Sequence, residues 1–199
     1  NLAVNARDAM PQGGKLTFEA KNITLDQAYV ERHHEIAEGD YVRPTILELG
    51  GKNPAIVSKN ANIEDAAVGI VRSAFGLQGQ KCSACSRVFV DEAVYDQLVE
   101  RVVALTKKLE IGDPTKRETY MGPVVAKSSY EDFKGFCEEL KEAGTVLTGG
   151  DVFTEGELAK GYFCPPTIAV DVQIDHRLWK HEMFVPITMI HPVKDLHEA

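Results

Sequence analysis

Apolar residues recur with the period of an α-helix in three stretches of the chain. These stretches are residues 63–76, residues from Asp91 or Glu92 to 112, and residues 126–143. In the second stretch the apolar face consists of Val94, Leu98, Val102, Leu105 and Leu109. A Gly-Asp-Pro sequence ends this helix and Gly144 ends the third, because glycine and proline interrupt helical hydrogen bonding. The pattern therefore predicts three amphipathic helices, and the first segment, NLAVNARDAM, is also expected to be helical.

Short apolar or alternating runs lie around these helices and predict β-strands. They cover residues 15–20, 45–49, 55–57, 86–90 and 145–148, part of 161–172, and 188–193. By contrast, residues 22–40 are polar and irregular, and the only element expected there is a short helix in DQAYVERHHEI. Strands that alternate with helices of this length predict an α/β fold, with a mostly parallel sheet covered on both faces.

The amino-acid composition disfavours several classes of function but does not identify one. The 199 residues carry 22 basic and 30 acidic side chains, a net charge of −8, and are 44% hydrophobic, as in an ordinary globular protein. An acidic chain without a basic run is a poor ligand for nucleic acid or an anionic membrane. There is no apolar run long enough to span a bilayer and no signal segment. Four cysteines do not form a secreted disulfide framework, so we expect a cytoplasmic protein.

Two of the cysteines, Cys82 and Cys85, lie close together in GQKCSACSR. A structural zinc site needs a second such pair, which Cys137 and Cys164 do not form. A dithiol redox motif normally follows a strand and opens a helix, whereas this one follows a helix and precedes a strand. Two interpretations remain. The thiols are buried and inert, or Cys82 is a nucleophile whose preceding Gly-Gln-Lys turn directs backbone N–H groups at an oxyanion.

A nucleophilic thiol needs a base, and Glu48 is the natural candidate. It ends an apolar strand directly before Gly50 and Gly51. A half-buried carboxylate in that position would have a raised pKa, which suits a general base near neutral pH. The alternative is a surface carboxylate at the end of a strand.

Two longer motifs connect these residues. LELGGKNPAIV, followed by FGLQGQKCSACSRVFV, resembles the aldehyde dehydrogenase superfamily. The match is close to the branch that oxidises glutamate γ-semialdehyde, the open form of 1-pyrroline-5-carboxylate. The resemblance continues through IGDPT, MGPVV, GYFCPPTI and HEMFVPITMIHPV, and so covers residues 43–199. It implies an α/β catalytic domain with a three-layer parallel sheet. It also implies NAD(P)-dependent oxidation of an aldehyde to a carboxylate, as in proline catabolism.

The resemblance assigns roles to particular residues. It makes Cys82 the nucleophile, which forms a thiohemiacetal and then a thioester, and Glu48 the base that activates the hydrolytic water. Three residues would bind NAD or NADP: Glu182 at the ribose, and Phe184 and Leu49 at the nicotinamide. Ser83 would contact the substrate carboxylate, and the backbone N–H of Cys82 would form half of the oxyanion hole. Cys85 becomes a buried thiol behind the site, and no metal is implied. The partner is a small-molecule aldehyde, and the family is homo-oligomeric.

The first residues carry a different resemblance. NLAVNARDAMPQGGKLTFEAKN resembles the N-box of the ATP-binding domain of sensor histidine kinases, in which Asn5 would help to hold Mg-ATP. The other ATP-binding motifs of that family are missing. We therefore expect a hybrid chain: an incomplete, unrelated α+β kinase-like fragment at 1–42, and a catalytic domain at 43–199 that lacks the NAD domain and the oligomerisation arm. Such a fragment would be poorly active or inactive. The alternative functions are an ATP-binding kinase fragment and an inactive hybrid.

Overall fold

A computed structural model of the protein describes residues 19–27, 31, 39–45, 50–195 and 197–199. The chain divides into two compact units, Asn1–Leu49 and Gly50–Ala199, and each unit is considered separately below. None of the helices formed by the described residues is long and apolar enough to cross a membrane.

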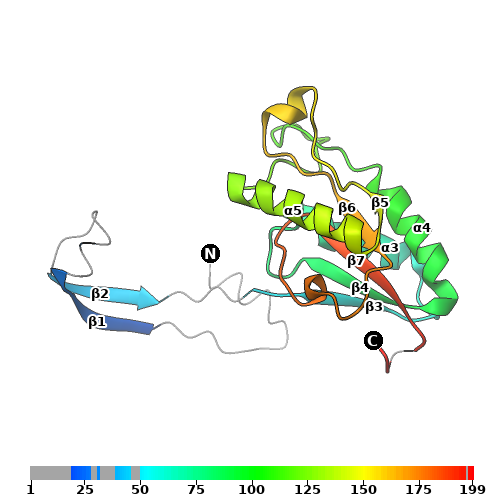
Figure 1. Ribbon diagram of the computed structural model, residues 1–199, viewed down its shortest axis with the longest axis horizontal. Helices are drawn as coiled ribbons and strands as arrows, with labels where there is room; N and C mark the ends of the chain where they lie inside the picture. The colour runs from blue at the N-terminus through cyan, green and yellow to red at the C-terminus, as the bar shows by residue number, and fades with distance from the viewer. Residues whose placement is uncertain (1–18, 28–30, 32–38, 46–49, 196) are drawn as a thin grey trace. The chain divides into compact units, whose positions relative to one another are not determined.

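The first unit contains a two-stranded antiparallel sheet (Figure 1). Strand β1 (Glu19–Leu25) pairs with β2 (Gly39–Thr45), and Ile23 lies opposite Tyr41. The prediction of irregular structure at 22–40 is therefore wrong at both ends of that segment. Hydrophobic alternation did not reveal these strands, because their backbone groups are satisfied by pairing with each other and strand formation depends on context more than on side-chain type. The predicted strand at 15–20 overlaps β1 at its last two residues, and 15–18 lie outside the described residues.

The second unit is built on a five-stranded sheet of order β3-β4-β7-β6-β5. The strands are β3 (Asn53–Val57), β4 (Cys85–Asp91), β5 (Thr145–Thr148), β6 (Thr167–Val170) and β7 (Ile187–Val193). Neighbouring strands are parallel except at one edge, where β5 runs antiparallel to β6. The predicted α/β fold with a mostly parallel sheet is confirmed.

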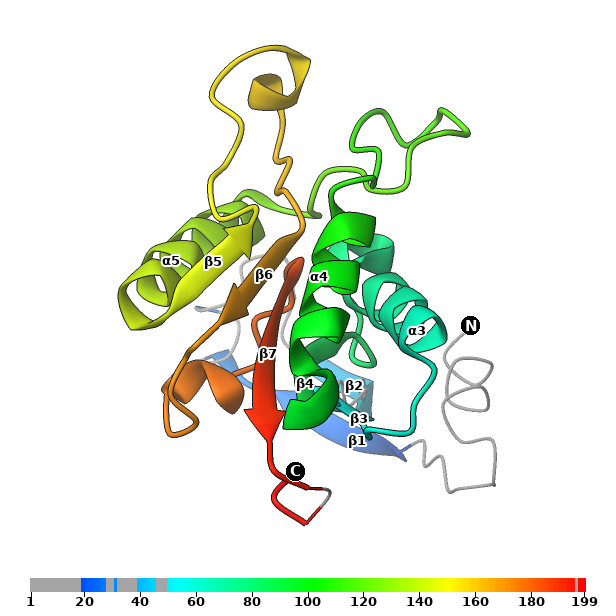
Figure 2. The same cartoon turned by 90° about the vertical axis from the view of Figure 1, so that its right-hand side faces the viewer.

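Helices cover both faces of this sheet and complete three layers (Figures 1 and 2). Helices α3 (Ile63–Phe75) and α4 (Tyr95–Thr106) lie on one face, and α5 (Lys127–Ala143) lies on the other. Short 3₁₀ turns are formed by η1 (Gly76–Gly79), η2 (Glu92–Val94), η3 (Glu157–Lys160) and η4 (Arg177–Trp179). Each interface between layers has its own buried apolar cluster. On the α5 side, the Trp179 ring stacks on Phe89 at 5.5 Å between centroids.

The helix boundaries agree with prediction at α3 and α5 and differ at α4. Helix α4 ends at Thr106 and does not reach Gly112. Beyond it, tight turns follow, in which the Leu109 N–H donates to the Thr106 carbonyl at 3.1 Å. The backbone of Glu110 then accepts the Tyr120 N–H at 2.9 Å. The chain leaves the helix because this segment pairs with a later one, which hydrophobic periodicity alone does not reveal.

Candidate active site

Cys82 lies in a tight turn between η1 and β4, and its side chain is exposed. The turn is closed by the Ala84 N–H, which donates to the Lys81 carbonyl at 3.0 Å. Its far end is fixed to helix α3, because the Cys85 N–H donates to Ser73 Oγ at 3.2 Å. An accessible thiol on an anchored turn is the placement that a nucleophile requires.

The backbone that leads into this turn is strained. Leu77 and Gln78 have φ values of 53° and 57°, in the left-handed region that L-residues rarely adopt. Gly79 continues the same conformation with φ of 67°, and a Cβ there would come within 2.6 Å of the Val185 carbonyl oxygen. Strain of this kind costs free energy and concentrates at functional sites. It also brings the loop before Cys82 into direct contact with the loop that carries Glu182.

The Gly-Gly-Lys segment before β3, with Asn53 at the start of the strand, lies against the other side of the Cys82 turn. Asn53 Nδ2 donates a hydrogen bond to the carbonyl oxygen of Cys82. A Cβ at Gly51 would overlap the same oxygen. Glycine at 51 is therefore required by the close approach of the Cys82 carbonyl.

The same segment also holds Glu182. The Gly51 N–H donates to Glu182 Oε1 at 2.9 Å, and a Cβ at Gly50 would collide with the Glu182 carboxyl group. Phe184, two residues on, has φ of 52° and is 44% exposed. The two glycines thus place the proposed nucleophile and the proposed ribose-binding carboxylate on either side of one short stretch of backbone.

Sequence reasoning missed the lysine in this segment. Lys52 Nζ is buried, and no described residue forms a hydrogen bond with it. Burial, reinforced by the positive charge of Arg87 and opposed by the negative charge of Glu182, lowers the pKa of the Lys52 ammonium to about 8. The sequence feature that could have indicated a buried Lys52 is its position directly after Gly50 and Gly51. Sequence analysis passed over it because a lysine just before a strand is usually solvated.

The other three cysteines are buried. Burial raises the pKa of the Cys85 thiol to about 11, and those of Cys137 and Cys164 to about 12. This burial agrees with the implied role of Cys85 as an inert thiol behind the site. The described residues contain no group of three His, Cys, Asp or Glu side chains that could hold a metal ion.

The sequence profile of the aldehyde dehydrogenase family matches residues 26–199. The chain belongs to this family. The match begins inside the predicted kinase-like fragment, so residues 26–42 fall within the aldehyde dehydrogenase match. The kinase-like interpretation of residues 1–42 stays a prediction.

Several relatives of this aldehyde dehydrogenase chain share a name. It is 43% identical over 170 residues to 1-pyrroline-5-carboxylate dehydrogenase of a Geobacillus species, covering 85% of this chain and 32% of the relative. It is 41% identical over 190 residues to 1-pyrroline-5-carboxylate dehydrogenase 2 of Halalkalibacterium halodurans, covering 95% and 36%. The structure of 1-pyrroline-5-carboxylate dehydrogenase from Thermus with bound NAD superposes with a TM-score of 0.69 at 37% identity, covering 75% and 28%. The chain thus spans about a third of the length of the curated relatives it matches.

The remaining predicted site residues of the aldehyde dehydrogenase chain are distributed as follows. Ser83 is exposed beside Cys82 and lines a groove of about 310 Å³ between β3 and α3. Glu48, Leu49 and Asn5 lie outside the described residues. The structure therefore brings Cys82 and Glu182 to the same glycine pair.

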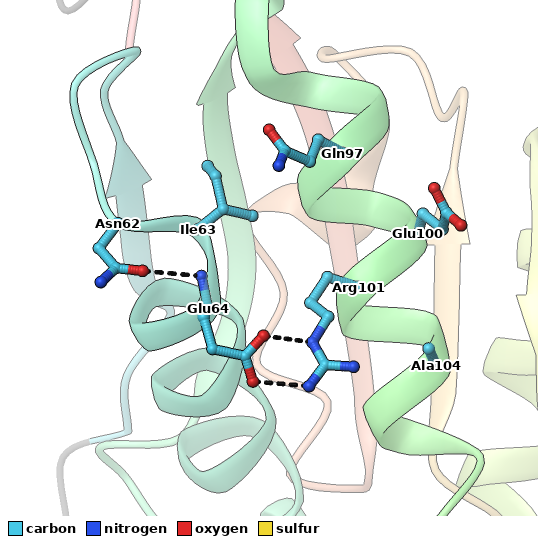
Figure 3. Close-up of a pocket in the computed structure, with 7 residues that line it drawn as sticks. All are labelled: Asn62, Ile63, Glu64, Gln97, Glu100, Arg101 and Ala104. Carbon is cyan, nitrogen blue, oxygen red and sulfur yellow. Dashed lines mark hydrogen bonds and ion pairs between the residues drawn. The ribbon is translucent and has the colours of Figure 1, made fainter.

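A larger hollow, of about 460 Å³, lies between helices α3 and α4 (Figure 3). Arg101 on α4 reaches across it to Glu64 on α3 and forms two hydrogen bonds, of 2.5 and 2.6 Å. It is lined by Asn62, Ile63, Glu64, Gln97, Glu100, Arg101 and Ala104. None of these residues belongs to the loops around Cys82, and we assign the hollow no part in the chemistry.

Proposed function

We propose that this chain carries the nucleophilic centre of an NAD(P)-dependent aldehyde dehydrogenase. The observation that carries the proposal is the exposed Cys82 thiol on a turn held by Asn53, with the same glycine segment holding Glu182. The family membership and the names of the relatives agree with this geometry.

As the substrate we propose L-glutamate γ-semialdehyde, the open form of 1-pyrroline-5-carboxylate. Two relatives that are 41–43% identical are named for this chemistry. The exposed hydroxyl of Ser83, next to Cys82, provides a donor for the carboxylate at the far end of such a substrate.

The proposed chemistry begins with the Cys82 thiolate. It adds to the aldehyde carbon, and the carbonyl oxygen becomes an oxyanion that accepts a hydrogen bond from the backbone N–H of Cys82. Oxidation of this thiohemiacetal leaves a thioester on Cys82. Glu48 then removes a proton from a water molecule, whose oxygen attacks the thioester carbonyl. The carboxylate product leaves, and the Cys82 sulfur is released as the thiolate.

The residues present fit a nicotinamide cofactor. The Glu182 carboxylate, positioned by the Gly51 N–H, is an acceptor for ribose hydroxyl groups, and the exposed Phe184 ring offers an apolar surface to the nicotinamide. We propose a further backbone contact at Leu49. When bound, NAD⁺ or NADP⁺ supplies the hydride acceptor for the oxidation step.

The proposed function also bears on the cellular compartment and the oligomeric state of the protein. All four cysteines are free thiols, as expected in a reducing compartment, and we propose the cytoplasm. The homo-oligomeric assembly implied by the family resemblance stays a prediction.

Acyl transfer from p-nitrophenyl acetate tests the nucleophile and the base. The Cys82 thiolate should displace nitrophenolate and become acetylated, and Glu48 should speed hydrolysis of that thioester. We expect Cys82→Ala to abolish acetylation, and Glu48→Gln to retain it but slow release of acetate by about 10²–10⁴-fold. Acetylation of another residue, or unchanged turnover in Cys82→Ala, would refute the assigned nucleophile.

Oxidation of 1-pyrroline-5-carboxylate with NAD⁺ or NADP⁺, followed by absorbance of the reduced cofactor, tests the substrate. Betaine aldehyde, which carries a cation and no carboxylate, is the comparison. A preference for 1-pyrroline-5-carboxylate that is lost in Ser83→Ala supports the assignment. A preference for betaine aldehyde contradicts it.

A further inference from the structure

A hydrogen bond from strand β4 holds the start of the loop that carries Glu182. This loop, residues 180–186, connects η4 to β7 and is called the Glu182 loop below. Arg87 in β4 donates from Nη1 to the carbonyl oxygen of Trp179, the last residue of η4, at 3.2 Å. The bond therefore joins the strand that begins at Cys85 to the backbone that leads into the Glu182 loop.

The sequence of β4 places this arginine beside an aromatic ring. Side chains two residues apart on a strand point to the same face, so Arg87 and Phe89 share the face that α5 covers. The guanidinium carbon lies 6.0 Å from the centre of the Phe89 ring, a distance at which a cation is attracted to the ring. The Phe89 ring stacks in turn on Trp179 at 5.5 Å. Arg87, Phe89 and Trp179 therefore form one packed group.

The Trp179 carbonyl depends on Arg87 for its hydrogen bond. Trp179 is 2% exposed, and its indole N–H donates to the Val172 carbonyl at 3.3 Å, so the residue is held away from water. Among the residues that the structure describes, Arg87 Nε is buried without a partner, and Lys52 brings a second positive charge close to the guanidinium. A buried carbonyl that loses its donor bears the full cost of desolvation. Loss of Arg87 would therefore drive the end of η4 to rearrange towards water.

The other contacts of this region cannot replace the bond. Arg177 donates from Nε to Glu139 Oε1 on α5 at 2.8 Å, but its side chain is 56% exposed, and exposed ion pairs contribute little to stability. At the far end, the Thr167 N–H donates at 2.9 Å to the carbonyl of the last loop residue. The loop is thus fixed by Arg87 at its start and by Thr167 at its end, with Glu182 between them.

We propose that Arg87 is a positioning residue for Glu182, the carboxylate proposed to bind the nicotinamide ribose. It acts through the Trp179 carbonyl, and it fixes the start of the loop so that Glu182 stays against the Gly51 N–H. The inference rests on the proposed function for its meaning in cofactor binding. The link between β4 and the loop is a structural statement that can be tested separately.

The fluorescence of Trp179 reports on this link, because the chain contains one tryptophan. Arg87→Met keeps an unbranched side chain and removes every donor. We expect acrylamide to quench Arg87→Met about twofold more strongly than the unsubstituted chain, and the 177–186 peptide to exchange deuterium faster, because the loop opens locally. Arg101→Met is the matched control, since Arg101 also joins two elements, through Glu64, but lies in the hollow between α3 and α4. It should change neither measurement.

Cofactor binding separates positioning from a purely structural role. We expect the Kd of NAD⁺, measured by isothermal titration calorimetry, to rise by about 3–10-fold in Arg87→Met, the range over which one hydrogen bond changes the population of a binding-competent loop. Acylation of Cys82 by p-nitrophenyl acetate uses neither Glu182 nor the cofactor, so its rate should change by less than about threefold. Arg87→Lys keeps the cation and a donor on a shorter side chain and should give intermediate values. It replaces Arg87→Met if that variant does not unfold cooperatively.

The outcomes decide the two parts separately. Unchanged quenching and exchange in Arg87→Met would show that Arg87 does not hold the loop. An unchanged affinity for NAD⁺, or an equal loss of affinity in Arg101→Met, overturns the positioning role, as does a parallel fall in NAD⁺ binding and acylation. If the unsubstituted chain does not bind NAD⁺, the proposed cofactor site fails, and quenching and exchange still decide whether Arg87 holds the loop.

Discussion

The four thiols of this chain differ sharply in environment. Cys82 is exposed, whereas burial raises the pKa of Cys85 to about 11 and those of Cys137 and Cys164 to about 12. Only a thiolate reacts with alkylating reagents, so the buried thiols should be inert at pH 8. We expect iodoacetamide to label the native chain at Cys82 alone, as measured by peptide mass spectrometry, and Cys82→Ser to abolish this labelling. Comparable labelling of Cys85 would show that the motif is not asymmetric.

Lys52 makes stability depend on pH in a direction opposite to that of a paired lysine. Its pKa is lowered from 10.5 to about 8, so between these values the folded chain binds fewer protons than the unfolded chain. The Lys52 contribution to stability therefore rises with pH across that window and is constant below it. The full window corresponds to a free energy on the order of 3 kcal/mol.

Substitution of Lys52 by methionine isolates this effect. We expect Lys52→Met to be more stable than the parent chain at pH 7 and the difference to shrink as the pH is raised to about 9.5, because the parent loses its buried charge. Urea unfolding at each pH measures the difference. Lys107→Met, at an exposed lysine after α4, is the control. A difference that is independent of pH would contradict a lowered pKa of Lys52 in the folded chain.

At the scale of elements, local signals were sufficient for helices and for buried strands. The apolar stripe at 63–76 marked α3, Gly144 marked the end of α5, and the run predicted at 188–193 marked β7. The end of helix α4 and the β1–β2 pair were misjudged because backbone pairing with a later segment, which periodicity does not reveal, decided both. The candidate site shows the same limit. The motifs identified Cys82, but the bonds from Gly51 to Glu182 and from Asn53 to Cys82 join residues 131 and 29 positions apart.

The start of helix α3 offers a test at this scale. The Asn62 side chain accepts the N–H groups of Glu64 and Asp65 at 3.1 and 3.3 Å, which would otherwise lack partners within the helix. We expect Asn62→Ala to lower the free energy of unfolding by about 1 kcal/mol. Asn62→Asp keeps the acceptor and should leave stability nearly unchanged in urea titrations. Unchanged stability in Asn62→Ala would show that the cap contributes nothing.

At the scale of the whole molecule, the two compact units predict where stability resides. The five-stranded sheet, its three helices and the apolar clusters on its two faces all lie in Gly50–Ala199. A chain reduced to residues 50–199 should therefore unfold cooperatively, with a midpoint within about 4 °C of the 199-residue chain, the shift that ~1 kcal/mol produces in a domain of this size. Cys82 should still be labelled selectively, since the contacts that hold its turn come from Gly51, Asn53 and Ser73.

The same shortened chain separates the two halves of the proposed chemistry, because it keeps the nucleophile and removes Glu48. We expect p-nitrophenyl acetate to acetylate Cys82 once and the thioester to persist, as in Glu48→Gln of the full chain, since no base remains to activate water. Mass spectrometry of the intact chain over time measures both events. Rapid loss of the acetyl group would show that another group within residues 50–199 activates the water, and broad, non-cooperative unfolding would show that this unit depends on the first 49 residues.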